Sequence, residues 1–346
     1  MRNRTVRFAV IGCGTISRFH IEAIRSQPDA ALTGVFDSVP SAAQQTAERY
    51  GVRQYPSYEA VLEDSEVDAV CICAPSFLHA KLAIQAAQAG KHMLIEKPVA
   101  LTLPDCDRLL AAVEKSGVKA AVVSQFRFCG AVAEIKRALD GGSLGKLLRG
   151  DLYMKYYRTP EYYREAPWRG SWEMSGGGAL MNQGIHGVDI LRYLMGPADT
   201  IYAVAGAKAR DIEVEDTLSA VVSFSSGAFG VIEASAADYP GKPRRIEING
   251  EKGMIALEED RIVQWLEEGG RQYSAEEAAA GPTSHADPTR IDPAGHRAQI
   301  AELVEAIREA GPLRTPVIEG RRTVEWIIGA YASAESGLPC ALNGAF

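Results

Sequence analysis

The chain has 346 residues, of which 47% are hydrophobic and 23% are charged, and its formal net charge is −7. This composition is typical of a folded globular protein and excludes disordered and fibrous classes, while the length predicts about two domains. The negative charge disfavours nucleic acid and anionic membrane surfaces as partners. The six cysteines include no C-x-x-C pair, so we expect neither a metal site nor a disulfide framework.

Neither a membrane span nor a signal peptide is expected. The longest uncharged stretch, residues 217–232, contains serines and glycines that suit a hairpin, and it is shorter than a membrane-spanning helix. The apolar run after Arg7 is shorter than the core of a secretory signal. We therefore expect a cytoplasmic protein.

The first third of the chain alternates between strand and helix patterns. Strands are predicted at residues 6–11, 31–36, 67–74, 92–95 and 120–124. Helices are predicted at 17–25, at 77–89, and from about Pro104, with Thr102 as the N-cap and Gly117 as the stop signal. This alternation predicts a doubly wound parallel sheet with helices on both faces, an N-terminal Rossmann domain over residues 1–126.

Beyond residue 147 the predicted strands are longer. They cover 148–157, 200–209, a hairpin over 217–236 that turns at Ser225-Ser-Gly227, and 245–257 with a turn at Asn249-Gly250. Helices are predicted at 178–195, 296–309 and 319–336, and an irregular loop at 267–292. We expect an α/β domain over residues 127–346 with a large, mostly antiparallel sheet.

A glycine-rich turn follows the first strand and opens the first helix. Its sequence, Gly12-Cys-Gly-Thr-Ile-Ser17, allows the backbone to approach a pyrophosphate, whose charge the helix N-terminus favours. Asp37, at the end of the second strand, can accept hydrogen bonds from both ribose hydroxyls and would repel a 2′-phosphate, although Ser38 could assist one. Because Ser17 replaces the third glycine of the fingerprint, an ordinary strand–turn–helix is the alternative. We expect NAD rather than NADP, bound by Gly12, Gly14, Thr15, Ile16, Asp37 and Ser38.

The tripeptide Glu96-Lys97-Pro98 follows the predicted strand at 92–95. Ligands bind at the carboxyl ends of strands in a doubly wound sheet, so Lys97 is expected to face the cofactor cleft. Its ammonium can hydrogen-bond an alcohol oxygen and stabilise the alkoxide that develops as hydride leaves. A solvated surface lysine is the alternative. A cis bond before Pro98 is one way to aim Lys97.

The predicted helix after Gly176-Gly-Gly178 presents polar residues along one face: Asn182, His186, Asp189 and Tyr193. A histidine has an unperturbed pKa of about 6.5, so His186 can take a substrate proton near neutral pH and return it in the reverse reaction. A half-buried structural histidine is the alternative. Gly184 and Gly187 each cost a helix about 1 kcal/mol relative to alanine, which indicates that something approaches the backbone closely.

Aromatic and arginine residues are frequent between the first long strand and the glycine triplet. They are Tyr153, Tyr156, Tyr157, Arg158, Tyr162, Tyr163, Arg164, Trp168, Arg169 and Trp172. Aromatic faces stack on sugar rings, and arginines bind hydroxyl or anionic groups, although both also form cores and interfaces. Arg164 and Trp168 are the best substrate candidates because they are expected to approach the helix that carries His186.

These motifs resemble the Gfo/Idh/MocA family, which includes glucose-fructose oxidoreductase and inositol dehydrogenase. The resemblance covers nearly the whole chain and rests on Gly12-Cys-Gly14, Ala74-Pro-Ser-Phe-Leu-His79, Glu96-Lys-Pro98, Arg127-Phe128 and residues 176–189. It implies an open-faced C-terminal sheet through which a homodimer or homotetramer forms. It also implies that Lys97 is the catalytic lysine and His186 the proton-transferring histidine, and that Ala74, Pro75, His79 and Glu96 lie along the cofactor.

One position departs from the family pattern. Many members have aspartate four residues before the histidine, where this chain has Asn182. An amide cannot relay a proton, so Asn182 is expected to orient the substrate or His186. Asp189 either supplies the missing carboxylate or binds a substrate hydroxyl. The expected substrate-binding residues are Lys97, Arg127, Arg164, Trp168, Asn182, His186 and Asp189.

Together these features predict an NAD-dependent dehydrogenase that acts reversibly on a secondary alcohol of a sugar, sugar derivative or cyclitol. One alternative is a glycosidase that uses bound NAD in an oxidation, elimination and re-reduction cycle without net NADH. Another is a non-catalytic sensor of NAD or sugar, which needs the cofactor pocket but no acid–base pair. The presence of both Lys97 and His186 favours an enzyme.

Overall fold

The computed structural model describes residues 4–274 and 292–342 and divides into two compact units. The first unit contains the described residues up to 125 together with 292–321. The second contains residues 126–274 and 322–342. Residues 292–321, which the sequence analysis assigns to the second domain, therefore pack with the first unit.

Six parallel strands form the sheet of the first unit, in the order β3-β2-β1-β4-β5-β6. They are β1 (Val6–Ile11), β2 (Ala30–Phe36), β3 (Arg53–Gln54), β4 (Ala69–Ile72), β5 (His92–Ile95) and β6 (Ala120–Val122). Every position of β4 is buried, as is typical of a parallel sheet covered on both faces. The strand order reverses between β1 and β4, and ligands of such sheets bind beyond the carboxyl ends at this point. The predicted doubly wound sheet is confirmed.

Seven α-helices belong to this unit in the described residues: α1 (Ser17–Arg25), α2 (Pro40–Tyr50), α3 (Tyr58–Glu63), α4 (His79–Gln88), α5 (Leu103–Ser116), α10 (Pro293–Glu309) and the start of α11 (Val317–Ser336). As predicted, Thr102 caps α5 by accepting a hydrogen bond from the Asp105 backbone, and Gly117 ends it with φ of 70°. Helix α10 packs on α1 and β1, and its Ile300 and Leu303 join their apolar core. This burial explains why a late segment completes the first unit.

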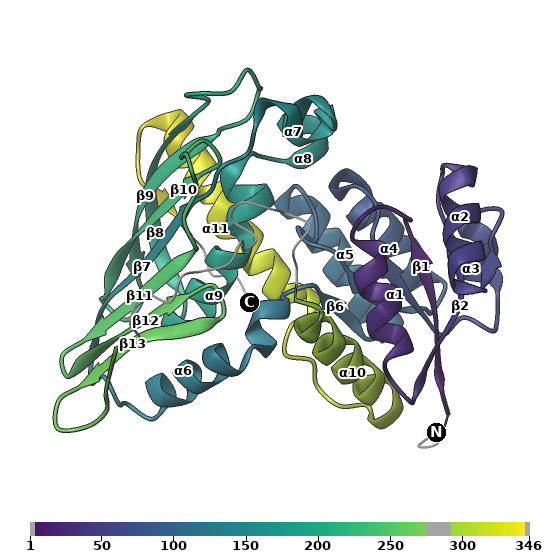
Figure 1. The fold of residues 1–346 in the computed structure, drawn as a ribbon, viewed down its shortest axis with the longest axis horizontal. Coiled ribbons are helices and arrows are strands. Elements are labelled where there is room, and N and C mark those ends of the chain that lie inside the picture. The colour runs from purple at the N-terminus through teal and green to yellow at the C-terminus, as the bar shows by residue number, and fades with distance from the viewer. Residues whose placement is uncertain (1–3, 275–291, 343–346) are drawn as a thin grey trace. The chain divides into compact units, whose positions relative to one another are not determined.

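The second unit is built on a nine-stranded sheet in the order β14-β13-β12-β11-β7-β10-β9-β8-β15. Figure 1 labels its strands β7 to β13. The strands are β7 (Leu147–Lys155), β8 (Ala198–Gly206), β9 (Thr217–Phe224), β10 (Phe229–Ser235), β11 (Arg245–Gly250), β12 (Gly253–Glu258), β13 (Arg261–Glu267), β14 (Gln272–Ser274) and β15 (Cys340–Ala341). Only the central β7–β10 pair among them is parallel. The predicted mostly antiparallel sheet is confirmed.

Helices cover one face of this sheet. The helical segments of the unit are η2 (Gln125–Phe128), α6 (Gly130–Asp140), α7 (Pro160–Arg164), η3 (Pro167–Gly170), α8 (Trp172–Ser175), η4 (Ala179–Gly184), α9 (Ile185–Met195) and most of α11. Helix α9 packs on β7, and Trp326 of α11 contacts Phe224 of β9 with ring centroids 5.8 Å apart. On the opposite face, Tyr202, Val204, Val221 and Phe229 are exposed. No helix in the described ranges is long and apolar enough to cross a membrane.

Three local features differ from the sequence prediction. The β11–β12 turn lies at residues 251–252 rather than at Asn249-Gly250, because Gly250 pairs with Gly253. The helix predicted over 178–195 begins as the π-helical turn η4 and continues as α9. The loop predicted over 267–292 contains β14, and its residues 275–291 lie outside the described part of the chain.

Candidate functional site

The glycine-rich turn lies at the carboxyl end of β1. Gly12 has φ of +94°, and a Cβ atom there would lie 2.7 Å from the carbonyl carbon of Cys73, so only glycine allows the ends of β1 and β4 to approach this closely. Asp37 closes the turn from β2: its Oδ2 accepts a hydrogen bond from the Cys13 backbone N at 2.7 Å. Ser17, at the position of the third glycine, is buried and donates its hydroxyl hydrogen bond to the Gly14 carbonyl at 2.7 Å.

The N-terminus of α1 is suited to an anion. It has no side-chain cap and no acidic residue in its first turn, so side chains do not occupy its first N–H groups. The space around Gly14 is open, since a Cβ there would have no heavy atom within 4 Å. Thr15, Ser38 and Pro75 are exposed, and Ile16, Asp37 and Ala74 are half-buried. These features fit the pyrophosphate and ribose of a dinucleotide.

His79 connects the segments that follow β4 and β5. Its Nε2 lies 2.8 Å from the Ala74 carbonyl oxygen, and its Nδ1 lies 2.6 Å from that of Pro98. Burial lowers the pKa of His79, although the two carbonyls oppose this shift. The neutral ring has one N–H and donates to one carbonyl at a time. His79 is 1% exposed and therefore supports the turn around Pro98, where the Lys97–Pro98 bond is cis.

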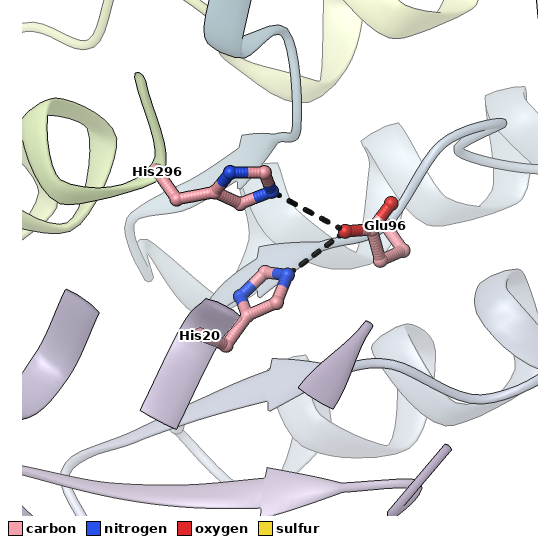
Figure 2. Close-up of side chains that lie close together, drawn as sticks. All are labelled: His20, Glu96 and His296. Carbon is pink, nitrogen blue, oxygen red and sulfur yellow. Dashed lines mark hydrogen bonds and ion pairs between the residues drawn. The ribbon is translucent and has the colours of Figure 1, made fainter. Parts of the chain in front are cut away.

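Glu96 points into the interior between two histidines (Figure 2). His20 of α1 donates from Nε2 to Glu96 Oε1 at 2.8 Å, and His296 Nε2 of α10 lies 3.9 Å from the same oxygen. Burial raises the pKa of Glu96, but the two histidines outweigh it and hold the pKa well below the usual value. All three residues are buried. Their contacts place the Glu96 carboxylate in this cluster, whereas the family resemblance implies that Glu96 lies along the cofactor.

Sequence reasoning missed this cluster because its members come from three distant segments. The ligand-type atoms of His20, Glu96 and His296 all lie within 4.8 Å of one another, so the cluster has the residue types and compactness of a metal site. The one signal in the sequence is His20, three residues after Ser17 on the inner face of α1. Nothing in the spacing links it to residue 296.

In the second unit, a buried carboxylate holds the start of the segment that carries Asn182 and His186. Glu215 accepts hydrogen bonds from the backbone N of Gly178 and of Leu180, both at 2.8 Å, and from the Tyr331 hydroxyl at 2.9 Å. Burial raises the pKa of Glu215, and these donors oppose that shift. Neither Glu215 nor Tyr331 belongs to a motif that was recognised in the sequence. The π-helical turn that follows is a feature often found at functional sites.

His186 and Asn182 are both half-buried. The His186 ring meets that of Phe126 edge-to-face, with centroids 5.3 Å apart, and the Arg244 guanidinium lies 4.2 Å over the Phe126 ring. Inside α9, a Cβ at Gly187 would lie 2.6 Å from Leu152 Cδ1. The close approach that was predicted at Gly187 is therefore made by Leu152 of β7.

Arg127 and Asp189, both expected to bind substrate, bind each other. Arg127 donates from Nε and Nη2 to the two carboxylate oxygens of Asp189 at 2.8 and 2.6 Å, and Thr323 donates to Oδ1 at 3.0 Å. Both members are buried, and the guanidinium lies 4.7 Å over the Tyr193 ring. These contacts support a role inside the second unit for both side chains.

The aromatic and arginine segment packs partly on itself. Arg169 lies 4.0 Å over the Tyr162 ring and 5.6 Å over Trp168, which is half-buried. Arg164 is exposed and pairs with Glu161. The Tyr162 hydroxyl accepts a hydrogen bond from Gln183 Nε2 at 3.3 Å, so Tyr162 contacts the segment beside Asn182. The cofactor candidates and Lys97 lie in the first unit, and the other substrate candidates in the second.

Two family models match the chain. Residues 6–124 match "Oxidoreductase family, NAD-binding Rossmann fold", and residues 132–256 match "GFO/IDH/MocA C-terminal domain". Together these ranges cover most of both units.

Relatives and solved structures are similar over most of the chain. Myo-inositol 2-dehydrogenase of Thermotoga maritima is 32% identical over 277 residues, 77% of this chain and 80% of the relative. The scyllo-inositol 2-dehydrogenase (NAD(+)) of Bacillus subtilis is 33% identical over 260 residues, 73% of each chain. The WlbA dehydrogenase from Bordetella pertussis, solved with NADH and UDP-GlcNAcA, is 33% identical with a TM-score of 0.87, covering 98% of this chain and 99% of that one.

Proposed function

This chain belongs to the Gfo/Idh/MocA family of NAD-dependent oxidoreductases, and from this premise we propose that Lys97 and His186 carry its chemistry on a secondary alcohol of a sugar, sugar derivative or cyclitol. One observation carries the proposal. Lys97 is the second residue after β5, in the same row of carboxyl strand ends as Gly12 after β1 and Ala74 after β4. In this fold, that row is where ligands bind.

The residues of the first unit fit a bound dinucleotide. The backbone from Gly12 to Ile16 and the uncapped start of α1 suit a pyrophosphate, and Asp37 suits a ribose because each carboxylate oxygen keeps acceptor capacity beyond its backbone bond. Bound NAD supplies the hydride acceptor. The carboxylate of Asp37 supports NAD over NADP, since a 2′-phosphate there would meet a negative charge.

In the proposed mechanism, this chain's side chains manage the proton and the charge. The Lys97 ammonium hydrogen-bonds the reacting oxygen and stabilises its developing negative charge. The His186 imidazole accepts the hydroxyl proton during oxidation and returns it during reduction. Asn182, half-buried four residues before His186, orients the substrate or the imidazole. We leave Asp189 and Arg127 out of these roles because their charged groups pair with each other.

The substrate is proposed to be a polyhydroxylated ring, alone or as part of a larger sugar derivative. The named inositol dehydrogenases support a cyclitol, and the WlbA structure supports a nucleotide-linked sugar acid. The segment over residues 153–172 contains aromatic side chains for a ring face and arginines for an anionic group. Within this segment, the Tyr162 hydroxyl is hydrogen-bonded by Gln183, the residue after Asn182, which makes Tyr162 a further candidate for contact with substrate.

A panel experiment tests the proposal. The purified protein is mixed with NAD or NADP and with inositols, free sugars, sugar acids or UDP-linked uronic acids, and the near-ultraviolet absorbance of NADH is followed. We expect NADH to form with at least one member, faster with NAD than with NADP. Release of a free sugar from a glycoside without net NADH would contradict a simple dehydrogenase.

The open face of the nine-stranded sheet supports the expected homodimer or homotetramer. Tyr202, Val221 and Val231 lie side by side across β8, β9 and β10, and the first two are more than two-fifths exposed. Contiguous exposed apolar side chains are typical of protein interfaces. We expect light scattering to give the mass of an oligomer, and Val221→Asp to reduce it. A monomeric wild-type protein would contradict this assembly.

A further inference from the structure

The buried cluster of Glu96, His20 and His296 adjoins the turn that carries Lys97, because Glu96 is the residue before Lys97. We propose that Glu96 is a positioning residue for Lys97, that a hydrogen bond from His20 holds Glu96 in place, and that His296 packs against the His20 ring and so fixes it. This inference rests on the proposed function, because it assigns a role through Lys97. It also gives helix α10, which is remote in sequence, a part in shaping the turn.

The two oxygens of Glu96 have different partners. Oε1 accepts the hydrogen bond from His20 Nε2 at 2.8 Å, and Oε2 accepts one from the Lys97 backbone N at 3.1 Å. The second bond folds the Glu96 side chain back onto the next peptide and so restrains the backbone dihedrals on either side of it. A carboxylate held at both oxygens cannot swing without releasing Lys97.

The proton arrangement in the cluster follows from the acceptor-only carboxylate. For His20 to donate from Nε2, its neutral ring leaves Nδ1 unprotonated, and that atom has no hydrogen-bond partner in the described part of the chain. Burial lowers the pKa of His20, against the raising effect of Glu96, which favours this neutral ring. Neither ring nitrogen of His296 has a hydrogen-bond partner among the described residues. The Glu96 carboxylate is therefore hydrogen-bonded to one buried ring, His20, and a second buried ring, His296, lies 3.9 Å from the same oxygen.

Packing fixes the two rings. His296 stacks on Phe19 with centroids 5.9 Å apart and an interplanar angle of 26°, and meets His20 edge-to-face at 5.3 Å. Both histidines are at most 1% exposed. On the other side of the turn, His79 binds the Pro98 carbonyl oxygen. Glu96 thus binds the backbone N of Lys97, and His79 binds the backbone carbonyl of Pro98, so a buried side chain restrains the backbone on each side of Lys97.

The hydrogen bonds to the two oxygens of Glu96, here called the Glu96 clamp, explain this geometry better than a metal site. Two histidines and a carboxylate form a familiar ligand set for divalent transition metals. Here, however, His20 and Glu96 contact each other at an ordinary hydrogen-bond distance, which uses the oxygen nearest both rings. Metal content is therefore one arm of the test.

The test compares Glu96→Gln, His20→Leu and His20→Gln with Lys97→Met, using the whole protein, NAD and the best substrate of the panel. An amide has an acceptor oxygen at only one of the two carboxylate positions, so it cannot accept from His20 at one position and from the Lys97 backbone at the other. We expect Glu96→Gln and His20→Leu to lower kcat about 10²-fold, the size of effect that a small misplacement of a reacting group produces, with little change in either KM. His20→Gln, whose amide can donate near the Nε2 position, should recover most of this loss.

The outcomes separate the positioning role from the proposed function. If Lys97→Met retains near-normal turnover, the assignment of Lys97 fails, and the positioning role fails with it. If Lys97→Met is inactive but Glu96→Gln and His20→Leu keep the wild-type kcat, only the positioning role is overturned. A merely structural role would lower the melting temperature and kcat together, without recovery in His20→Gln. One equivalent of a divalent metal in the wild-type protein, lost in His296→Ala, would also overturn the clamp.

Discussion

Each candidate catalytic side chain has a buried carboxylate close to it in sequence, but the two carboxylates have different partners. Glu96, before Lys97, is hydrogen-bonded by His20 and has His296 nearby, whereas Asp189, three residues after His186, is bound by Arg127 at both oxygens. A guanidinium stays charged at every accessible pH, while a buried imidazole does not. The comparison indicates that the candidate site of the first unit is sensitive to pH through its histidines, whereas the buried carboxylate of the second unit is paired with a guanidinium, which does not titrate.

The largest expected effect is the loss of kcat in Lys97→Met, which tests whether Lys97 contributes to the reaction rather than to the stability of the fold. We expect Lys97→Met to reduce kcat by about 10²–10³-fold, since a donor to the developing oxyanion is lost. The melting temperature and the affinity for NADH, measured by its fluorescence, should change little. Lys115→Met, on the exposed surface of α5, is the matched control and should leave kcat unchanged. Near-normal turnover in Lys97→Met would show that Lys97 is not a catalytic residue.

Breaking the pair in the second unit should have the opposite profile. Arg127→Met leaves the Asp189 carboxylate buried without its guanidinium, and breaking such a pair costs about 3–5 kcal/mol of the free energy of unfolding. Chemical denaturation checks this loss. The double variant Arg127→Met with Asp189→Leu removes both charges and should recover much of the stability. A single variant as stable as the wild-type protein would show that the pair contributes little.

Sequence patterns located the elements better than the contacts between them. The strand–turn–helix signals near Gly12, Thr102 and Gly117 are local, so the parallel sheet was predictable from them. The membership of α10 in the first unit was not, because its apolar residues meet α1 only in the folded chain. The π-helical turn at Asn182 was also missed, since the spacing argument assumes a regular helix.

The same limit applies to the candidate site. Lys97 and His186 stand out because residue type and position along an element suggest their chemistry. The directions of the Glu96 and Asp189 side chains depend on partners elsewhere in the chain, such as His296 and Arg127, that no short motif contains. The internal hydrogen bonds of Glu96 and Asp189 were therefore not predictable from the residues near each motif.

The smallest expected effect is on the pH dependence of stability, and it sharpens the contrast between the units. Burial lowers the pKa of His20, His79 and His92, all in the first unit. The unfolded chain then binds protons on these rings at a pH where the folded chain does not, so the free energy of unfolding falls as the pH drops below about 6.5. The low pKa of Glu96 adds a further loss at more acidic pH.

Calorimetry at a series of pH values measures this loss, which grows with the amount by which folding lowers the pKa of each ring. His20→Gln removes one titrating ring while keeping a donor to Glu96, so its melting temperature should fall less steeply with acid than that of the wild-type protein. Hydrogen exchange should show the first unit opening before the second, because the Arg127–Asp189 pair does not depend on a neutral histidine. A melting temperature that is flat from about pH 7.5 to about pH 5.5 would mean that these rings have similar pKa values in the folded and unfolded chains. The prediction that the buried histidines make the first unit less stable in acid would then be wrong, even if the hydrogen bonds of the Glu96 cluster are as the structure has them.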